Sequence, residues 1–321
     1  MSRKSIVLKR LVAAPFLLLA IWSCIFLVIK AAPGDPMRYF ADEYAYRYPE
    51  YYEALRHELG FDKPVYEQFI TYLVRLTRGD FGFSFAYSKP VLDVITERFF
   101  NTIMLTGSAF LFSIFLGVIL GVIASKKPYS ALDNAISSSS LMVASMPAFW
   151  ISLIFLLAFG LHFRIFPPGG LISVGKTGIE YWLDYLWHLF LPAFVLGISN
   201  LAVYVRLTRA SMLEQLGKDY ILTAWSKGCS ERTIYYKHAL RNALLPIVTV
   251  IGMRMAWLLY GSVLVETVFA WPGMGMLIYD AIFARDYNII MATFVLVSTL
   301  VIVFNLITDI IYTYLDPRIA H

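Results

Sequence analysis

One stretch of the sequence matches a pattern that binds the phosphates of nucleotides. Residues 170–177, GLISVGKT, fit G-x-x-x-x-G-K-[S/T] letter for letter. In proteins that use this loop, a buried strand precedes it and a helix follows it. Here the preceding residues, RIFPPGG, contain two prolines and adjacent glycines, which are typical of turns rather than of a strand. We therefore interpret the match as coincidental.

Two acidic residues lie within strongly apolar stretches. Glu266 is near the outer end of one stretch, and Asp309 is near the inner end of another, four residues after Asn305 and so on the same helix face. Ionisable groups are costly inside a membrane and often have a function there. Each residue also has an interpretation without a function. Glu266 would then be a water-exposed helix end, and Asp309 would pair with an Arg or Lys from a loop.

Other residue types that commonly perform catalysis or bind metals are not grouped in this sequence. The five histidines lack metal-ligand spacing, no Gly-x-Ser-x-Gly occurs, and the two cysteines, Cys24 and Cys229, lie in an apolar run and a polar loop. The sequence therefore predicts no catalytic, cofactor-binding or metal-binding residue, and a protein that is not itself an enzyme.

A short amphipathic segment, KDYILTAWSKG at residues 218–228, lies in a region rich in Arg and Lys. Its apolar side chains follow the spacing i, i+1, i+4, i+5, which places them on one helix face; they are Tyr220, Ile221, Ala224 and Trp225. A helix this short cannot span a bilayer. Its apolar face either fits a groove in another protein or lies flat on the inner leaflet, with its basic residues among the lipid headgroups.

This segment is expected to be the first half of a helix–turn–helix. Gly228 is suited to end the first helix, and Ser230 is suited to cap a second, SERTIYYKHALRNALL. The second helix is expected to continue to Pro246, where the next apolar run begins.

Composition places the chain in a membrane. It is 59% hydrophobic and 15% charged, whereas soluble domains carry about 25% charged residues. Helices of about 20 apolar residues can cross a bilayer because every backbone polar group is paired within the segment. We predict an all-α membrane protein with six such spans, at residues 11–30, 101–124, 134–161, 188–208, 246–269 and 289–313.

Lys and Arg in short loops predict the orientation, because they mark the cytoplasmic side. They precede the first run, separate the second from the third, and are frequent between the fourth and fifth: Arg3, Lys4, Lys9, Arg10, Lys126, Lys127, Arg206, Arg209, Lys218, Lys227, Arg232, Lys237 and Arg241. Both termini are then cytoplasmic, and the net charge of +5 needs no nucleic acid to explain it. The first run is longer than the 7–15 apolar residues of a cleaved signal peptide, so we expect it to remain as a span.

The segment 32–98 is expected to be extracytoplasmic and folded. Pro49 and Pro64 can each begin a helix that Gly60 and Gly79 end, and Pro90 opens a helix that leads into the second span. The Tyr-rich stretch within residues 39–52 is expected to stack on sugars, to line a docking surface, or to form an aromatic belt at the membrane interface with local packing.

Two further features concern the spans themselves. Met146-Pro147 should kink the third span and leave one backbone carbonyl without its helical hydrogen bond. Such a carbonyl is tolerated in a membrane only where protein or a cavity covers it. Gly117 and Gly121 form a small-xxx-small pair that suits close helix contact.

Several motifs together resemble one family along nearly the whole chain. Residues 219–246, DYILTAWSKGCSERTIYYKHALRNALLP, resemble the cytoplasmic EAA-type loop of bacterial and archaeal ABC importer permeases, with Trp225 in place of a basic residue and Cys229 in place of an apolar one. The dipeptide/oligopeptide branch, in its first permease type, is similar at APGDP (32–36), GDFGFSF (79–85), MPAFW (146–150), LPAFVLGISNLAVYVRLTRASM (191–212), VETVFAWPGMG (265–275), RDY (285–287) and LDPRI (315–319).

The resemblance implies a type I ABC importer permease fold and a set of partners. These would be a second, homologous permease, two ATP-hydrolysing subunits that use ATP and Mg²⁺, and an extracytoplasmic solute-binding protein. The loop helix between spans four and five would be the coupling helix that docks on an ATPase subunit, through Asp219, Tyr220, Thr223, Ala224, Trp225, Lys227 and Gly228. The substrate path or gate is expected near Met146, Pro147, Phe149 and Glu266.

These expectations divide the chain into four parts. They are a cytoplasmic tail with the first span (1–31), the extracytoplasmic segment (32–98), the core permease (99–314, with the coupling loop at 209–245) and a cytoplasmic tail (315–321). The protein would lie in the cell (inner) membrane of a bacterium or archaeon and carry short peptides. The alternatives are the same kind of permease for oligosaccharides or another small solute and, from a different class, a secondary transporter, which would need coupling-ion residues deep in the spans.

Overall fold

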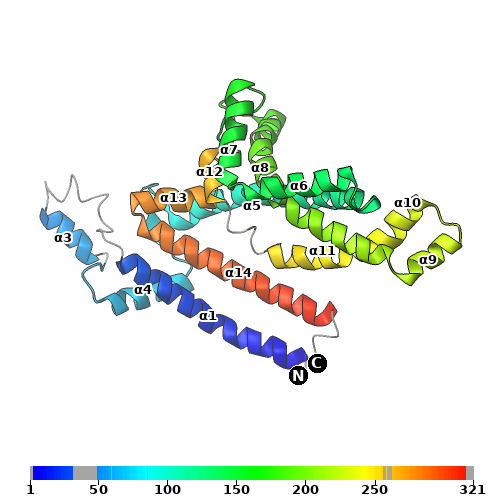
Figure 1. Ribbon diagram of the computed structural model, residues 1–321. Coiled ribbons are helices and arrows are strands. Elements are labelled where there is room, and N and C mark those ends of the chain that lie inside the picture. The colour runs from blue at the N-terminus through cyan, green and yellow to red at the C-terminus, as the bar shows by residue number, and fades with distance from the viewer. Residues whose placement is uncertain are drawn as a thin grey trace. The chain divides into compact units, whose positions relative to one another are not determined.

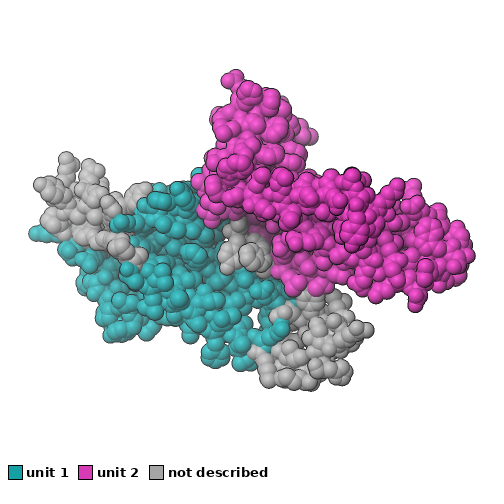
Figure 2. All heavy atoms as spheres, in the orientation of Figure 1, with its two compact units in different colours: residues 1–100, 273–321 teal, residues 101–272 magenta. Residues whose placement is uncertain are grey.

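The computed structural model describes residues 3–31, 49–58, 60–84, 86–255, 258 and 262–315. Apart from loops, they form helices and one small antiparallel sheet, in which β1 (Phe83–Ser84) pairs with β2 (Lys89–Pro90) (Figure 1). The chain divides into two compact units, residues 1–100 with 273–321 and residues 101–272 (Figure 2). The predicted all-α class is confirmed.

Two long helices form the frame of the first unit. α1 (Arg3–Ala31) packs along α14 (Tyr287–Leu315), and Trp22 Nε1 donates a hydrogen bond of 3.3 Å to Ser298 Oγ. Both helices contain stretches long and apolar enough to cross a membrane. They correspond to the predicted first and sixth spans.

The helices predicted between the first two spans are present in the first unit. α3 (Pro49–Glu58) and α4 (Val65–Thr77) begin at or just after the expected prolines. Gly60 and Gly79 follow them with φ of +73° each, a conformation that glycine adopts without a Cβ penalty. Residues 32–48, which include most of the Tyr-rich stretch, lie outside the described residues.

Two of the family-like motifs contact each other in this unit. Ser84 Oγ donates to Asp286 Oδ2 over 2.6 Å, and Asp286 Oδ1 accepts the amide of Ile289 over 3.2 Å. Asn288 Nδ2 donates to the carbonyl of Phe83 over 2.9 Å. The RDY motif therefore caps α14 and fixes the β1–β2 hairpin of the GDFGFSF motif to its start.

A hydrophobic cluster joins the remaining helices of this unit. α13 (Met274–Ala284) contributes Leu277, α14 contributes Ile289, and the first turns of α5 (Val91–Lys126) contribute Ile95. α5 runs from Val91 through the predicted second span without a break, as expected from Pro90.

The second unit holds the other helices. Besides residues 101–126 of α5, it contains the α-helices α6 (Ala131–Ser145), α7 (Ala148–Phe155), α8 (Gly178–Leu216), α9 (Asp219–Ser226), α10 (Glu231–Thr233), α11 (Leu240–Arg254) and α12 (Val263–Val268). It also contains two π-helices, η2 (Leu156–His162) and η3 (Ile234–Ala239).

Among the described residues, the number of single helices fit to cross a membrane is smaller than six. Four helices pass by length and composition, and five if the bent pair α6 and α7–η2 counts as one span. The predicted fifth span, 246–269, is not one helix, because α11 ends at Arg254 and α12 begins at Val263. Ser262, just before α12, is extended and donates its amide to the Glu266 carboxylate, so the backbone leaves the helical path there.

The predicted kink at Met146-Pro147 is confirmed and is a full break. α6 ends at Ser145, Pro147 occupies the position before α7, and the two helices meet at an angle of 100° (Figure 1). The break follows from proline, which cannot donate the intrahelical hydrogen bond and disfavours helical geometry in the residue before it.

The glycine pair of α5 is a site of close helix contact. A Cβ on Gly117 would lie 2.4 Å from Tyr204 Cβ, and one on Gly121 would lie 2.5 Å from Thr208 Cβ on α8. A Cβ on a third glycine, Gly197 of α8, would lie 2.6 Å from Phe112 Cδ1 of α5. The small-xxx-small prediction is confirmed, because these backbones approach too closely for any side chain.

Candidate functional site

The amphipathic segment folds as the short helix α9, with the predicted boundaries. Gly228 ends it with φ of +73°, and its amide donates to the Trp225 carbonyl over 2.9 Å. Ser230 then caps the next helix, its Oγ accepting the amide of Thr233 over 3.4 Å. In Figure 1, α9 and α10 lie beyond the ends of α8 and α11, at one end of the second unit.

The four apolar residues of α9 divide between the interior and the surface. Ile221 and Ala224 are 1% and 6% exposed and pack in a cluster with Met212. Tyr220 and Trp225 remain 37% and 49% exposed. The expectation of one continuous contact face is therefore corrected: half of it anchors α9 to its own chain, because a helix of eight residues needs internal packing to hold its position.

The predicted docking residues other than Ala224 all lie at the surface. Asp219, Tyr220, Thr223, Trp225, Lys227 and Gly228 are exposed, whereas Ala224 is internal and supports the helix. Leu222, which the sequence prediction omitted, is 61% exposed on the same helix. Its position three residues before Trp225 is the signal that could have identified it.

Hydrogen bonds orient Tyr220 at the start of this surface. Its hydroxyl donates to Gln215 Oε1 over 3.0 Å and accepts from Asn242 Nδ2 over 3.2 Å. Because Gln215 is on α8 and Asn242 is on α11, one exposed side chain of α9 is tied to both helices that flank the loop.

The second helix of the loop is longer than predicted. α10, η3 and α11 follow one another from Glu231 to Arg254, and Pro246 lies inside α11 instead of ending the helix. Tyr235 Oη donates to the carbonyl of Lys126 over 3.3 Å. Burial raises the pKa of Tyr235, the charge of Glu231 adds to this increase, and the charge of Lys126 opposes it.

An ion pair joins two helices beside this loop. Arg209 Nε and Nη2 donate to the two oxygens of Asp133 over 2.6 Å each, and the Arg209 guanidinium lies over the Tyr129 ring at 5.7 Å. Asp133 also accepts the amide of Tyr129 over 2.7 Å. This two-pronged geometry fixes the start of α6 against α8.

The predicted path residues Met146, Pro147 and Phe149 lie at the break between α6 and α7. Phe149 is 42% exposed and Met146 packs partly against a cluster that contains Val265. Their role in a substrate path stays a prediction.

Glu266 is fully buried in the second unit. Its Oε1 accepts from Thr102 Oγ1 over 3.2 Å and from the amide of Ser262 over 3.3 Å. The alternative that Glu266 is a water-exposed helix end is therefore wrong. The side chain of Asp309 lies outside the described residues.

The phosphate-loop match does not have the structure that nucleotide binding needs. Residues 163–177 are all described and contain no strand. Lys176 pairs with Glu180 at 3.1 Å, and Asp184 accepts from both the amide and the hydroxyl of Ser173. The lysine and the loop thus have partners within this chain, in agreement with a coincidental match.

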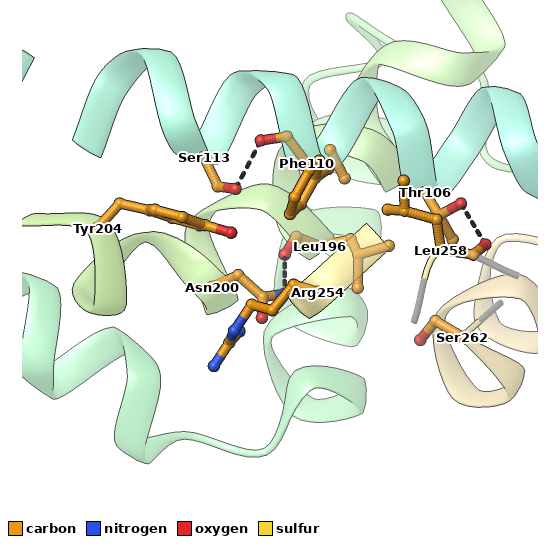
Figure 3. Close-up of a pocket in the computed structure, with 10 residues that line it drawn as sticks. Thr106, Phe110, Ser113, Leu196, Asn200, Tyr204, Arg254, Leu258 and Ser262 are labelled. Carbon is orange, nitrogen blue, oxygen red and sulfur yellow. Dashed lines mark hydrogen bonds between the residues drawn. The ribbon is translucent and has the colours of Figure 1, made fainter. Parts of the chain in front are cut away.

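A cavity of about 390 Å³ lies between α5, α8 and the end of α11. Its lining is Thr106, Ala109, Phe110, Ser113, Leu196, Asn200, Tyr204, Arg254, Leu258 and Ser262 (Figure 3). The four predicted path residues are absent from this lining. Glu266 lies behind it, because its carboxylate accepts a hydrogen bond from the amide of the lining residue Ser262. The sequence offered a signal that was overlooked, since Arg254 is a cation inside the predicted fifth span.

Comparisons with known proteins cover nearly the whole chain. Residues 117–321 match the model of the binding-protein-dependent transport system inner membrane component, and residues 3–106 match the model of the N-terminal part of such membrane components.

Three similar proteins carry the names of peptide permeases. An oligopeptide transport system permease protein of Bacillus subtilis (strain 168) is 38% identical over 98% of this chain and 99% of its own length. A dipeptide transport system permease protein of Escherichia coli (strain K12) is 38% identical over 92% of this chain and 93% of its own. A di/tripeptide transport system permease protein of Pseudomonas aeruginosa (strain UCBPP-PA14) is 39% identical over 92% and 93%.

Proposed function

Because this chain belongs to the family of binding-protein-dependent transport system inner membrane components, we propose that it is the permease subunit of an ATP-driven importer of short peptides. It forms half of the translocation path, and a second, homologous permease forms the other half. Two ATP-binding subunits dock on the cytoplasmic side, and an extracytoplasmic binding protein delivers the solute. The observation that carries the peptide assignment is similarity over 92–98% of the chain, at 38–39% identity, to proteins named as peptide permeases.

The exposed part of α9 supports the coupling step. Tyr220, Leu222 and Trp225 expose apolar surface on a helix that Ile221 and Ala224 hold rigidly to the chain. Aromatic side chains on a fixed helix are effective anchors in a partner's groove, because little conformational entropy is lost on binding. Movement of an ATPase subunit would pass through α9 to α8 and α11, to which Tyr220 is hydrogen-bonded.

The membrane topology belongs to the same proposal. Six spans place both termini and α9 in the cytoplasm, as the distribution of Lys and Arg indicates. α6 with α7–η2 forms the third span despite its break, and the fifth span is the predicted one, residues 246–269. A cysteine introduced in α9 should then react with a membrane-impermeant thiol reagent only from the cytoplasmic side.

Uptake into vesicles tests the substrate and the energy source together. Vesicles that carry the full complex, with the binding protein outside and ATP inside, are supplied with a dipeptide or a neutral disaccharide. We expect ATP-dependent uptake of the dipeptide. Uptake of the disaccharide alone would favour the oligosaccharide importer, and dipeptide uptake driven by an ion gradient without ATP would favour a secondary transporter.

A further inference from the structure

The cavity of the second unit combines one cation with a group of hydrogen-bond donors. Arg254, the last residue of α11, is half-buried, and Tyr204 is completely buried on α8. Figure 3 shows the Tyr204 ring, the Asn200 amide and the Arg254 side chain gathered on one side of the cavity, with Thr106 and Ser262 on the other.

Two of these groups have no counterpart in the part of the chain that the structure describes. The buried hydroxyl of Tyr204 has no hydrogen-bond partner there. Arg254 takes part in none of the ion pairs between described residues, and the cavity lining contains no Asp or Glu. A buried hydroxyl and a cation in an apolar region are both costly without a partner. Both groups therefore point to a ligand that accepts hydrogen bonds and carries negative charge.

The other polar groups of the lining are partly occupied. Asn200 Nδ2 donates to the Leu196 carbonyl over 3.0 Å, which leaves its second N–H available. The hydroxyls of Thr106 and Ser113 donate to the carbonyls of Leu258 and Phe110 over 2.8 Å each. The donors that remain, from Arg254, Tyr204 and Asn200, belong to residues of two helices that line the cavity.

We propose that this cavity is a subsite for the C-terminal carboxylate of the transported peptide, with Arg254 as its charge partner and Tyr204 and Asn200 as further donors. The proposal rests on the proposed function, because it assumes that a peptide is carried. A guanidinium matches a carboxylate with two parallel hydrogen bonds, which gives both charge and direction. The cavity volume of about 390 Å³ corresponds to roughly a dozen water molecules, enough for a terminal residue rather than for a long peptide.

Uptake of two peptides that differ only at the C-terminus tests the subsite. The full complex in vesicles is supplied with a dipeptide or with its C-terminal amide, each at a concentration that saturates the binding protein. For each peptide, uptake by Arg254→Gln is divided by uptake by the unaltered complex. Any preference of the binding protein cancels in these ratios, because the same binding protein is used throughout.

We expect Arg254→Gln to lower uptake of the free dipeptide about tenfold, since a hydrogen bond to a charged partner is lost. Uptake of the amide should change less than twofold. Arg254→Lys should restore part of the free-acid uptake, and Tyr204→Phe should lower it by a smaller factor. Arg206→Gln, which removes an exposed guanidinium elsewhere on α8, is the control and should leave both peptides unaffected.

Three outcomes would overturn the proposal. If both peptides lose uptake by the same factor, Arg254 holds the structure or pairs with another subunit. If neither loses uptake, the cavity is not on the path of the carboxylate. If Arg254→Lys is as poor as Arg254→Gln, charge is not what the site provides. Failure of the unaltered complex to import either peptide is a separate result, which overturns the proposed function itself.

Discussion

At the residue scale, Trp225 carries the clearest prediction for assembly. A fully desolvated aromatic anchor contributes about 2 kcal/mol or more to an interface. Trp225→Asp replaces the half-exposed ring with a charge and should release the ATPase subunits from the purified complex while the permease stays in the membrane. Subunit stoichiometry after size-exclusion chromatography measures this. Trp225→Phe keeps a ring and is the control; unchanged stoichiometry in the Asp variant would contradict the docking role.

Glu266 also has a test at this scale. The sequence places Glu266 near the expected substrate path, where a carboxylate could meet the ammonium group of a peptide, but the structure shows it buried and bound by Thr102 and Ser262. A carboxylate so enclosed should act on structure rather than on substrate. We therefore expect Glu266→Gln to leave the uptake ratio of a free dipeptide to its N-acetylated form unchanged. A ratio that falls toward one would restore the substrate role.

The sequence predicted some of the candidate residues and missed others. Spacing predicted the helix that carries Tyr220, Ile221, Ala224 and Trp225, but it could not divide these residues between core and surface, because that depends on contacts with distant residues such as Met212. The same limit hid the Asp133–Arg209 pair, whose members are 76 positions apart. The sequence shows Arg254 as a cation in an apolar run, but only the structure shows that it lines a cavity and is therefore a candidate for ligand binding.

At the element scale, local signals in the sequence were reliable where one residue type acts alone. Prolines and glycines predicted the bounds of α3, α4 and α9, and the break before α7. Predictions from hydropathy were less accurate for segment ends. Residues 246–269 are apolar enough on average to be predicted as one span, despite Arg254 and Glu266, yet the described helices there stop at Arg254 and restart at Val263. Hydropathy does not register a local hydrogen bond such as that between Ser262 and Glu266.

The contact between α5 and α8 gives a prediction for stability. Gly121→Ala places a Cβ 2.5 Å from Thr208 Cβ and 2.8 Å from the Val205 carbonyl, and overpacking of this kind costs about 1–3 kcal/mol. Gly107→Ala on the same helix meets nothing within 4 Å and gains helix propensity, so it should be neutral or stabilising. Heating the purified complex and measuring the soluble fraction compares them; equal midpoints would show that the helices separate easily at Gly121.

At the scale of the whole molecule, the proposed division of labour assigns solute passage to this chain and ATP hydrolysis to its partners. α9 is the element suited to connect the two tasks, since it is anchored to α8 and α11 and exposes aromatic surface. The phosphate-loop match at residues 170–177 would contradict this division only if it bound a nucleotide. It therefore provides a test of the whole assignment.

Lys176→Ala removes the residue that would contact phosphates in a true phosphate-binding loop. In this chain Lys176 forms an exposed pair with Glu180 at 3.1 Å, and such pairs contribute little to stability. We expect the assembled complex to bind and hydrolyse ATP at an unchanged rate, because its nucleotide sites would lie on other subunits. Nucleotide binding and phosphate release by the purified complex measure this, with Lys127→Ala as the matched lysine control. A selective loss of ATP binding in Lys176→Ala would place a nucleotide site on this chain and overturn both the topology and the division of labour.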